Sequence, residues 1–283
     1  MARGGNPVFN GKNFNSQIRG GAAPGKGSVA TQDPGYMSPQ QLQELYTAPS
    51  AGPVQTGRMT YDDVIMKTLL CLAVVLVGAA VPMLLVPGLA TPLMIVGALG
   101  GFVLGLVNSF KREPAPGLIL AYAGLEGLFL GGLTLVLDTL YPGIGLQAVL
   151  GTLSVFGVTL LLFKSGKVRA TPKAVRFFMI AMIGYAVFSL VNVGMMIFGA
   201  QNTMFGMRDS VEIMGIPLGV LIGIFAVGLA AFSLIMDFTA IEQGVIAGAP
   251  RRYSWTAAFG LTVTLVWLYV EIIRILAILR GND

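Results

Sequence analysis

Two apolar stretches near the C-terminus decide the fold: LAAFSLIMDFTAIEQG at residues 229–244 and WTAAFGLTVTLVWLYVEIIRIL at residues 255–276. Each of them holds an acidic residue, Asp237 in the first and Glu271 in the second. A charged side chain in the middle of a membrane helix costs about 2.5–3.5 kcal/mol, so such a residue usually faces the interior of a helix bundle and has a function. The short loop GAPRR at residues 248–252 predicts that the two stretches form antiparallel, neighbouring helices.

The composition places the chain among integral membrane proteins. Of its 283 residues, 55% are hydrophobic and 11% are charged, and the mean hydropathy is +0.78. Soluble domains contain about 25% charged residues. The chain has no histidine and one cysteine, Cys71, which excludes Ser-His-Asp triads, metal sites built on His or Cys, and internal disulfides. A response to pH within the membrane must therefore fall on carboxylates.

Hydropathy predicts an all-α integral membrane protein with seven spans, each close to the ~20 residues that a bilayer requires. The expected spans are 65–86, 92–110, 117–137, 144–163, 175–199, 216–238 and 255–278. Residues 1–57 are rich in Gly, Pro, Gln, Ser and Asn, and we expect a disordered tail there, with a docking peptide as the alternative. The chain then divides into this tail and a transmembrane domain at 58–283.

The basic residues predict the orientation of the bundle. In alternate loops they gather on one side, which carries Lys111, Arg112, Lys164, Lys167, Arg169, Lys173, Arg176, Arg251 and Arg252 together with the basic residues of the tail. The other side has Arg208 and Arg280. By the positive-inside rule the N-terminus is cytoplasmic and the C-terminus lies outside. The net charge of +5 is thus explained by topology, and we expect the lipid bilayer, with no nucleic acid, as a partner.

Small residues recur at four-residue spacing on three of the expected spans. They are Gly97, Gly101 and Gly105 on the second, Gly127 and Gly131 on the third, and Gly219 and Gly223 on the sixth. Such stripes allow the backbones of two membrane helices to approach closely. They favour packing within the chain, and a dimer face is the alternative.

A third acid, Glu126, lies midway along the third span, and Arg274 follows Glu271 on the same helical face. A local ion pair with Arg274 is one interpretation of Glu271, and a protonated acid bonded to a neighbouring helix is one interpretation of Glu126. The functional interpretation joins the acids with Asp237 in a cluster that shares a proton or binds a hard cation such as Ca²⁺. Counted from the loop, Glu271 lies deeper than Asp237 by roughly 10 Å.

The acidic stretches resemble the Bax inhibitor-1 family of seven-span membrane proteins, in its bacterial branch. FSLIMDFTAI at 232–241 and LYVEIIRIL at 268–276 carry the resemblance, together with the basic pair Lys111-Arg112 before the third span. The resemblance covers about residues 60–280. It implies a central seventh helix wrapped by six others and a latch between Asp237 and Glu271, the two acids that would contact Ca²⁺. Lys111 or Arg112 would be a cationic partner of the latch.

The resemblance further implies a pH-sensitive calcium leak channel of the bacterial inner membrane, gated by the carboxylate pair. Calcium or protons would be its transported ions, and we expect no cofactor and no enzymatic activity. The alternative is a regulator that does not conduct and that binds a membrane protease or another integral membrane partner. No GxGD-like loop surrounds either acid and no HExxH occurs, which argues against an intramembrane protease.

The charge pattern yields a testable topology. With Cys71 replaced by alanine, single cysteines introduced as Asn202→Cys and Asp283→Cys should react with an impermeant thiol reagent added outside intact cells. Labelling of these positions only from the cytoplasmic side would contradict the orientation.

Overall fold

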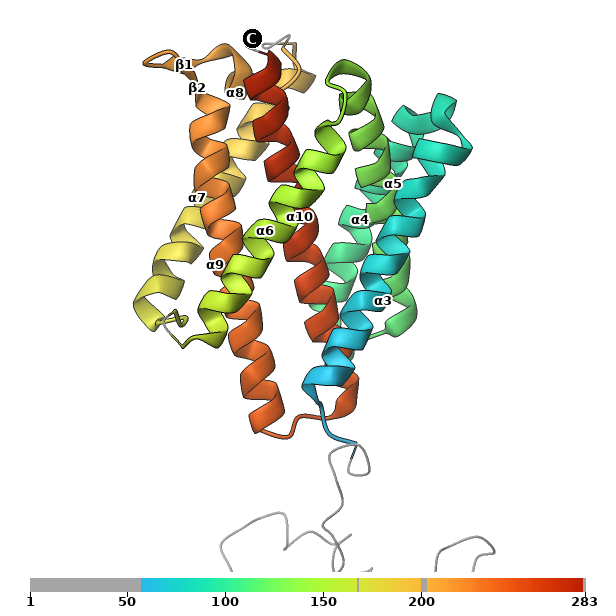
Figure 1. The fold of residues 1–283 in the computed structure, drawn as a ribbon, viewed down its shortest axis with the longest axis vertical. Coiled ribbons are helices and arrows are strands. Elements are labelled where there is room, and N and C mark those ends of the chain that lie inside the picture. Colours follow the sequence, from blue (N-terminus) through green and yellow to red (C-terminus); the bar gives the residue numbers. More distant parts are fainter. Residues whose placement is uncertain (1–56, 167, 200–202, 282–283) are drawn as a thin grey trace, which may run out of the picture. The chain divides into compact units, whose positions relative to one another are not determined.

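The computed structural model describes residues 57–166, 168–199 and 203–281, and in this part of the chain seven helices are long and apolar enough to cross a membrane (Figure 1). The seven spans are α3 Tyr61–Ala80 with its π-helical extension η3 Val81–Leu85, the 3₁₀ turn η4 Pro87–Leu89 with α4 Ala90–Phe110, α5 Pro116–Leu140, α6 Ile144–Lys164, α7 Pro172–Ile197, α9 Leu218–Ile246, and η5 Arg251–Tyr253 with α10 Ser254–Gly281. Between α7 and α9 lie the short helix α8 Met207–Ser210 and an antiparallel pair of strands, β1 Glu212–Ile213 and β2 Ile216–Pro217. The predicted seven-helix bundle is confirmed.

Local sequence signals set most helix ends. Proline occupies the first turn of α5 and α7, where its missing N–H has no partner to lose. Thr60 and Thr171 cap α3 and α7 by accepting a hydrogen bond from the backbone N–H three residues on. The sixth span ends at Ile246, past its expected end at 238, and Glu242 and Gln243 belong to its last turns. The helix stops just before Gly248, which has a positive φ angle.

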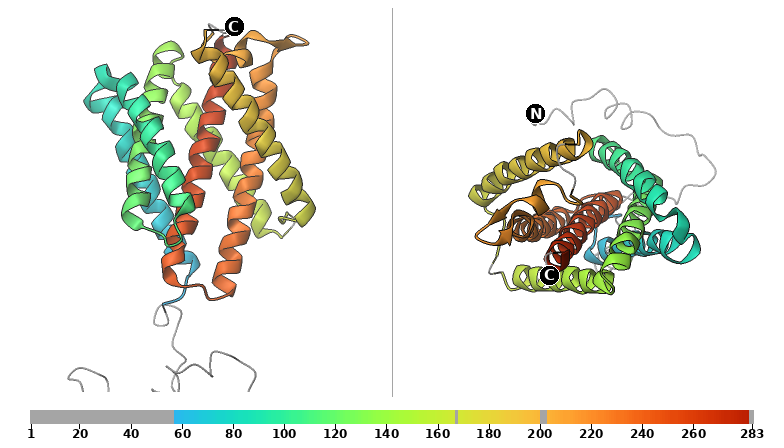
Figure 2. Two further views of the ribbon diagram at one scale, coloured as in Figure 1. Left: turned by 180° about the vertical axis from the view of Figure 1, so that it is seen from behind. Right: turned by 90° about the horizontal axis from the view of Figure 1, so that it is seen from above.

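Helix α10 lies at the centre of the bundle, as the resemblance implied (Figure 2). It packs against α9, α3, α6 and α5. Of the 18-residue apolar segment in the span that contains α10, half is buried inside the protein, whereas only 6% of the corresponding segment of α7 is buried. Helix α10 is therefore enclosed by protein, while α7 mostly faces outward.

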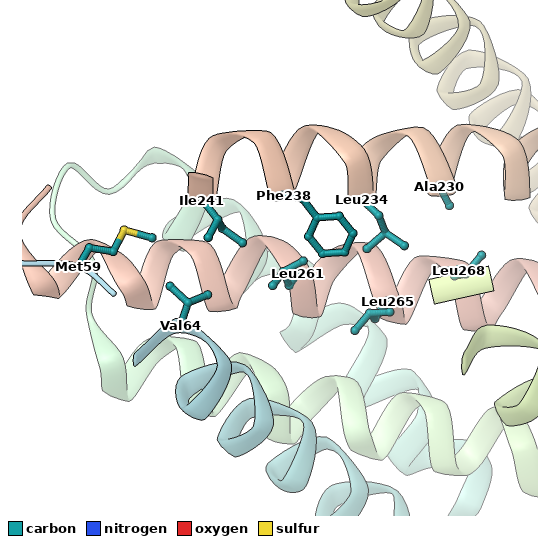
Figure 3. Packing of buried hydrophobic residues seen from close by; sticks show 9 residues of the cluster. All are labelled: Met59, Val64, Ala230, Leu234, Phe238, Ile241, Leu261, Leu265 and Leu268. Atoms are coloured by element: carbon teal, nitrogen blue, oxygen red, sulfur yellow. The ribbon is translucent and has the colours of Figure 1, made fainter. Parts of the chain in front are cut away.

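The contact between α9 and α10 is an apolar seam at helical spacing (Figure 3). The seam is formed by Ala230, Leu234, Phe238 and Ile241 of α9 with Leu261, Leu265 and Leu268 of α10. Met59 and Val64, at the start of α3, close the cluster at one end. The apolar face of each helix is therefore buried against the other, and the polar residues of both helices sit beside this seam.

The glycine stripes pack within the chain, as favoured by the sequence. A Cβ atom on Gly97 of α4 would lie 2.5 Å from the backbone N of Phe129 and 2.6 Å from the carbonyl O of Leu125, both on α5. Gly127 and Gly131 bring α5 equally close to the backbone of α3. Helices α3 and α4 thus each approach α5 at distances that only glycine permits.

The bundle has two ends. The basic end holds the start of α3, Lys111 and the α9–α10 loop, and the C-terminal end holds Leu140 and Gly281. At the basic end the chain entering α3 is bonded to the α9–α10 loop, because Met59 N donates to Ala249 O (2.7 Å) and Arg251 N donates to Gly57 O (2.8 Å). Defined contacts thus begin at Gly57, the last residue of the expected tail. The rest of that tail lies outside the described residues.

Substituting Gly97 should measure the α4–α5 contact. Gly97→Ala forces two backbones apart, and we expect a loss of about 1–3 kcal/mol in stability, seen as a lower thermal midpoint in detergent. Gly157→Ala on α6 is the matched control, since no atom lies within 4 Å of its Cβ position. Equal midpoints for the two variants would contradict the close packing.

Candidate functional site

Asp237 lies on the face of α9 that meets α10. Its Oδ2 accepts a hydrogen bond from Thr264 Oγ1 of α10 (2.8 Å). One turn earlier on α10 stands Gly260, whose Cβ position is 3.5 Å from Asp237 Oδ1, so the carboxylate occupies space that a side chain there would restrict. Asp237 is therefore fixed by a hydroxyl of the central helix and remains partly exposed.

The exposed side of Asp237 faces a cavity of about 520 Å³ at the basic end. This volume is typical of sites that bind small ligands. Oxygen- and nitrogen-bearing side chains in its lining are Asn108, Ser109, Lys111, Asp237, Tyr253 and Thr256. Ser109, Lys111 and Thr256 are exposed, so the cavity reaches the protein surface at the basic end.

Lys111 and Asp237 share this cavity, which agrees with the implied cationic partner. Lys111 is the C-terminal cap of α4, so its side chain leaves the membrane end of that helix. No ion pair joins Lys111 to Asp237 in the part of the chain that the structure describes. Arg112 follows in the exposed loop and does not line the cavity. Lys111 is thus the better placed of the two candidate partners.

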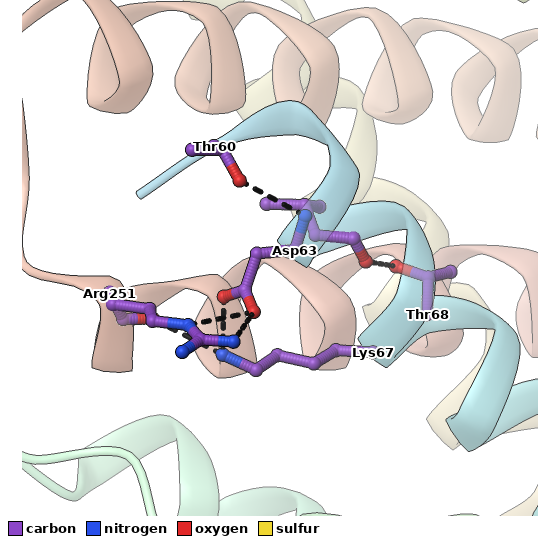
Figure 4. A network of polar contacts seen from close by, with 6 residues as sticks. Thr60, Asp63, Lys67, Thr68 and Arg251 are labelled. Carbon is purple, nitrogen blue, oxygen red and sulfur yellow. Dashed lines mark hydrogen bonds and ion pairs between the residues drawn. The ribbon is translucent and has the colours of Figure 1, made fainter. Parts of the chain in front are cut away.

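Ion pairs hold the α9–α10 loop in place beside the cavity. Asp63 binds Arg251 (Nη2–Oδ1, 3.0 Å) and Lys67 (Nζ–Oδ2, 2.6 Å), and the same Lys67 donates to the carbonyl of Arg251 (Figure 4). Arg252 pairs with Glu113 in the α4–α5 loop (2.9 Å). These contacts connect the loop to α3 on one side and to the α4–α5 loop on the other.

Hydroxyl groups continue from Asp237 along the α9–α10 contact. Thr264 Oγ1, which donates to Asp237, lies 3.4 Å from Ser233 Oγ. Ser233 precedes Asp237 by one turn of α9 and so lies nearer the C-terminal end of the bundle. Polar side chains at this seam replace the solvent contacts that a carboxylate loses inside a bundle. The two hydroxyl groups thus extend the polar contacts of Asp237 toward the C-terminal end of the bundle.

Glu271 belongs to a separate cluster, nearer the C-terminal end. Its side chain is 1% exposed, forms an ion pair with Arg274, and accepts hydrogen bonds from the hydroxyl of Tyr185 and from Trp267 Nε1 (3.2 Å). The local ion pair with Arg274, one of the interpretations of the sequence, is therefore present.

Arg208, from the short helix α8, completes this cluster. It is 4% exposed, and its Nη2 donates to Ser189 Oγ (2.7 Å) and to the hydroxyl of Tyr185 (3.4 Å). The hydroxyl of Tyr185 also accepts from Arg274 Nη2 (3.3 Å). Nε and Nη1 of Arg208 are buried without a hydrogen-bond partner among the described residues. The cluster thus places two guanidinium groups and one carboxylate inside the protein, across α7, α8 and α10.

Glu126 is buried in a third place, between α4 and α5. Its exposed fraction is 9%, and a Cβ atom on Gly101 of α4 would lie 2.7 Å from its Oε1. Within the described residues no hydrogen bond or ion pair joins Glu126 to Asp237 or Glu271. The glycine stripe of α4 provides the space that this carboxyl group fills.

The structure does not bring the three acids together. Thr264, the partner of Asp237, and Glu271 are two turns apart on α10, about 10 Å along the helix axis. Over residues 57–166, 168–199 and 203–281 no group of three or more His, Cys, Asp or Glu side chains is close enough to hold a metal ion. A direct latch between Asp237 and Glu271 is therefore not formed here, and their roles stay a prediction.

The sequence did not single out several residues of these clusters as site residues. They are Tyr185, Ser189, Arg208, Ser233, Thr264 and Trp267. One signal was available for Arg208, which is one of two basic residues on the side of the bundle where basic residues are rare. The hydroxyl residues carry no such signal, because isolated Ser, Thr and Tyr are common in membrane helices.

Seven apolar helices, six of them arranged around the central α10, define a multi-pass membrane protein. The family model of Bax inhibitor 1 like proteins matches residues 6–281, and the chain belongs to this family. The resemblance based on sequence motifs covered about residues 60–280, whereas the family match begins earlier, at residue 6. No curated protein matches the chain. The bacterial branch and the absence of enzymatic activity stay predictions.

The Glu271 cluster can be tested through stability. Glu271→Gln leaves the guanidinium of Arg274 without its carboxylate, and breaking a buried ion pair typically costs about 3–5 kcal/mol. We expect a large fall in the thermal midpoint of the detergent-solubilised protein. Glu113→Gln is the matched control, because its pair with Arg252 is exposed and such pairs contribute about 0–1 kcal/mol. Similar midpoints for both variants would contradict the ionic cluster.

Proposed function

We propose that this chain is a pH-sensitive leak pathway for calcium or another cation, with its basic end in the cytoplasm. The observation that carries the proposal is the cavity at the basic end, which leads from exposed Ser109 and Lys111 to Asp237 inside the membrane region. A carboxylate that a cavity connects to the surface is what a cation pathway requires, and intramembrane acids commonly mark such pathways.

The chemistry of the cavity suits a hard cation. Ca²⁺ binds oxygen ligands, from carboxylates, hydroxyls and carbonyls, at flexible coordination numbers. Asp237, which is bonded to the hydroxyl of Thr264, provides a carboxylate to the cavity, and Asn108, Ser109 and Thr256 line the rest of the space. One carboxylate with neutral oxygens favours weak, transient binding, which an ion must have in order to pass on.

The C-terminal half of the α9–α10 region contains the second part of the proposed pathway, a closed gate. Tyr185, Arg208, Glu271 and Arg274 fill the interior there with side chains from α7, α8 and α10. Arg208 holds two buried nitrogens that have no partner among the described residues, so the closed arrangement retains polar groups that are not satisfied there. This cost favours opening, because the same groups would gain water when the cluster separates.

Protonation of Asp237 is the proposed pH switch. Among the described residues that line the cavity it is the only acid, with Lys111 and Tyr253 as the other titratable groups. The charged carboxylate attracts a cation and also the ammonium of Lys111, whereas the protonated form attracts neither. Conduction should therefore change as Asp237 takes up a proton, and Lys111 should compete with the entering cation.

Calcium flux into proteoliposomes, measured over a range of pH, tests this function. Asp237→Asn should abolish the pH dependence, and Glu242→Gln, on the same helix but outside the cavity, should preserve it. Lys111→Gln should raise the flux several-fold by removing the competing ammonium. Lys164→Gln, also at the basic end but outside the cavity, should leave the flux unchanged.

Two results would count against these assignments. A pH dependence that survives Asp237→Asn would show that another group senses protons. No flux at any pH from folded protein would favour the alternative, a regulator that binds a membrane protease or another integral partner.

A further inference from the structure

A second cavity, of about 640 Å³, lies on the side of the bundle and is independent of the proposed pathway. It runs between α3 and α6, with α10 as its floor and α5 as a further part of its wall. Helices α3 and α6 both pack on α10. The wall is almost wholly apolar and includes Leu72, Leu76, Val149, Leu153, Leu265 and Tyr269.

The groove has the depth of one bilayer leaflet. On α3 and its extension it reaches from Leu72 to Met83, a rise of about 16 Å at 1.5 Å per residue. The hydrocarbon core of a bilayer is about 30 Å thick, so this length corresponds to half of it. The Met83 end lies toward the C-terminal end of the bundle, and the Leu72 end lies near the middle of the membrane.

The groove opens sideways to the bilayer. Leu76 on one rim and Leu146 on the other are each 68% exposed, and Leu153 is 58% exposed. In the hydrocarbon region the surrounding solvent is lipid acyl chain, so an apolar groove open to it is filled by a tail of matching length. A tail in the groove would contact side chains of α3, α6 and α10 together.

A charged residue marks the headgroup end of the groove. Asp138, at the end of α5, is the only charged residue among the described residues that line it. Its Oδ1 accepts a hydrogen bond from the backbone N of Gly143 (2.9 Å), so Oδ2 is the carboxylate oxygen available to a ligand. Arg280 of α10 does not line the groove; it donates to the carbonyl of Pro142 (3.0 Å) and to Gln147 Oε1 (2.9 Å) and so holds the turn after α5. The groove thus carries a carboxylate at this end, which complements the ammonium of a zwitterionic lipid.

We propose that this groove binds one phospholipid, with an acyl chain between α3 and α6 and a primary ammonium of the headgroup on Asp138. The lipid comes from the leaflet at the C-terminal end of the bundle. It packs α3 and α6 onto α10 and so occupies a defined site on the central helix.

Photolabelling of the full chain in phosphatidylglycerol nanodiscs tests the site. The probes are phosphatidylethanolamine and phosphatidylglycerol, each with a photoreactive group on its acyl chain, and peptide mass spectrometry locates the adducts. We expect the phosphatidylethanolamine probe to label the α3 and α6 walls several-fold more than α7, which is also exposed to lipid. Asp138→Asn keeps Oδ1 for Gly143 and should remove the preference for phosphatidylethanolamine over phosphatidylglycerol.

Filling the groove provides the second test. Val149→Trp should reduce labelling of the walls several-fold, and Val158→Trp, exposed on the same helix but outside the groove, should not. Leu76→Trp fills the groove from the α3 side and replaces Val149→Trp if that variant does not elute as a single folded species. Uniform labelling of all lipid-facing helices, or crosslinks between two copies of the chain in place of lipid adducts, would overturn the site. Equal or stronger labelling of the walls by phosphatidylglycerol in the unmodified chain would overturn the role of Asp138.

Discussion

The ion pair between Glu271 and Arg274 is the interaction on which the arrangement of this bundle depends. Charged side chains on a membrane helix must be enclosed by protein, because lipid offers neither counter-charge nor hydrogen bonds. Helix α10 carries this pair, and it is the helix that the others surround. Tyr185 of α7 is bonded to both members of the pair and also accepts a hydrogen bond from Arg208 of α8, so α7 is tied to α10 directly and α8 is tied to it through Tyr185.

Two kinds of packing hold the rest of the bundle around α10. Helices α3, α4 and α5 meet through glycines such as Gly97 and Gly131, where backbone approaches backbone. Helices α9 and α10 meet instead through large side chains, including Leu234, Phe238 and Leu265. Contacts between backbones tolerate little movement, whereas interdigitated side chains can repack. The residues of the proposed pathway lie along the second kind of contact, where a change of packing is easier.

The α9–α10 contact is different at its two ends. Toward the basic end Asp237 faces an open cavity, and beside this cavity the ion pairs of Asp63 with Arg251 and of Arg252 with Glu113 hold the connecting loop. Toward the C-terminal end the Glu271 cluster fills the interior. Since two turns of α10 separate Thr264 from Glu271, the acids act at different depths. The α9–α10 contact is thus open at one end and filled at the other, and the proposed closed gate rests on this asymmetry.

The sequence by itself determined the seven spans, the glycine stripes and the identity of the two acidic helices, because hydropathy and residue spacing act within a single helix. For Glu271 the sequence allowed two interpretations, an ion pair with Arg274 and a cluster with Asp237. The ion pair could be predicted from the sequence, because Arg274 lies three residues away on the same helix. Only the tertiary structure decided which faces of the helices meet. Tyr185 and Glu271 are 86 positions apart in the chain, and Lys111 reaches the cavity of Asp237 from another helix. Span patterns leave the rotation of each helix about its axis open, and that rotation brought Thr264 to Asp237, whereas Asp237 and Glu271 are separated by their different depths along the helices.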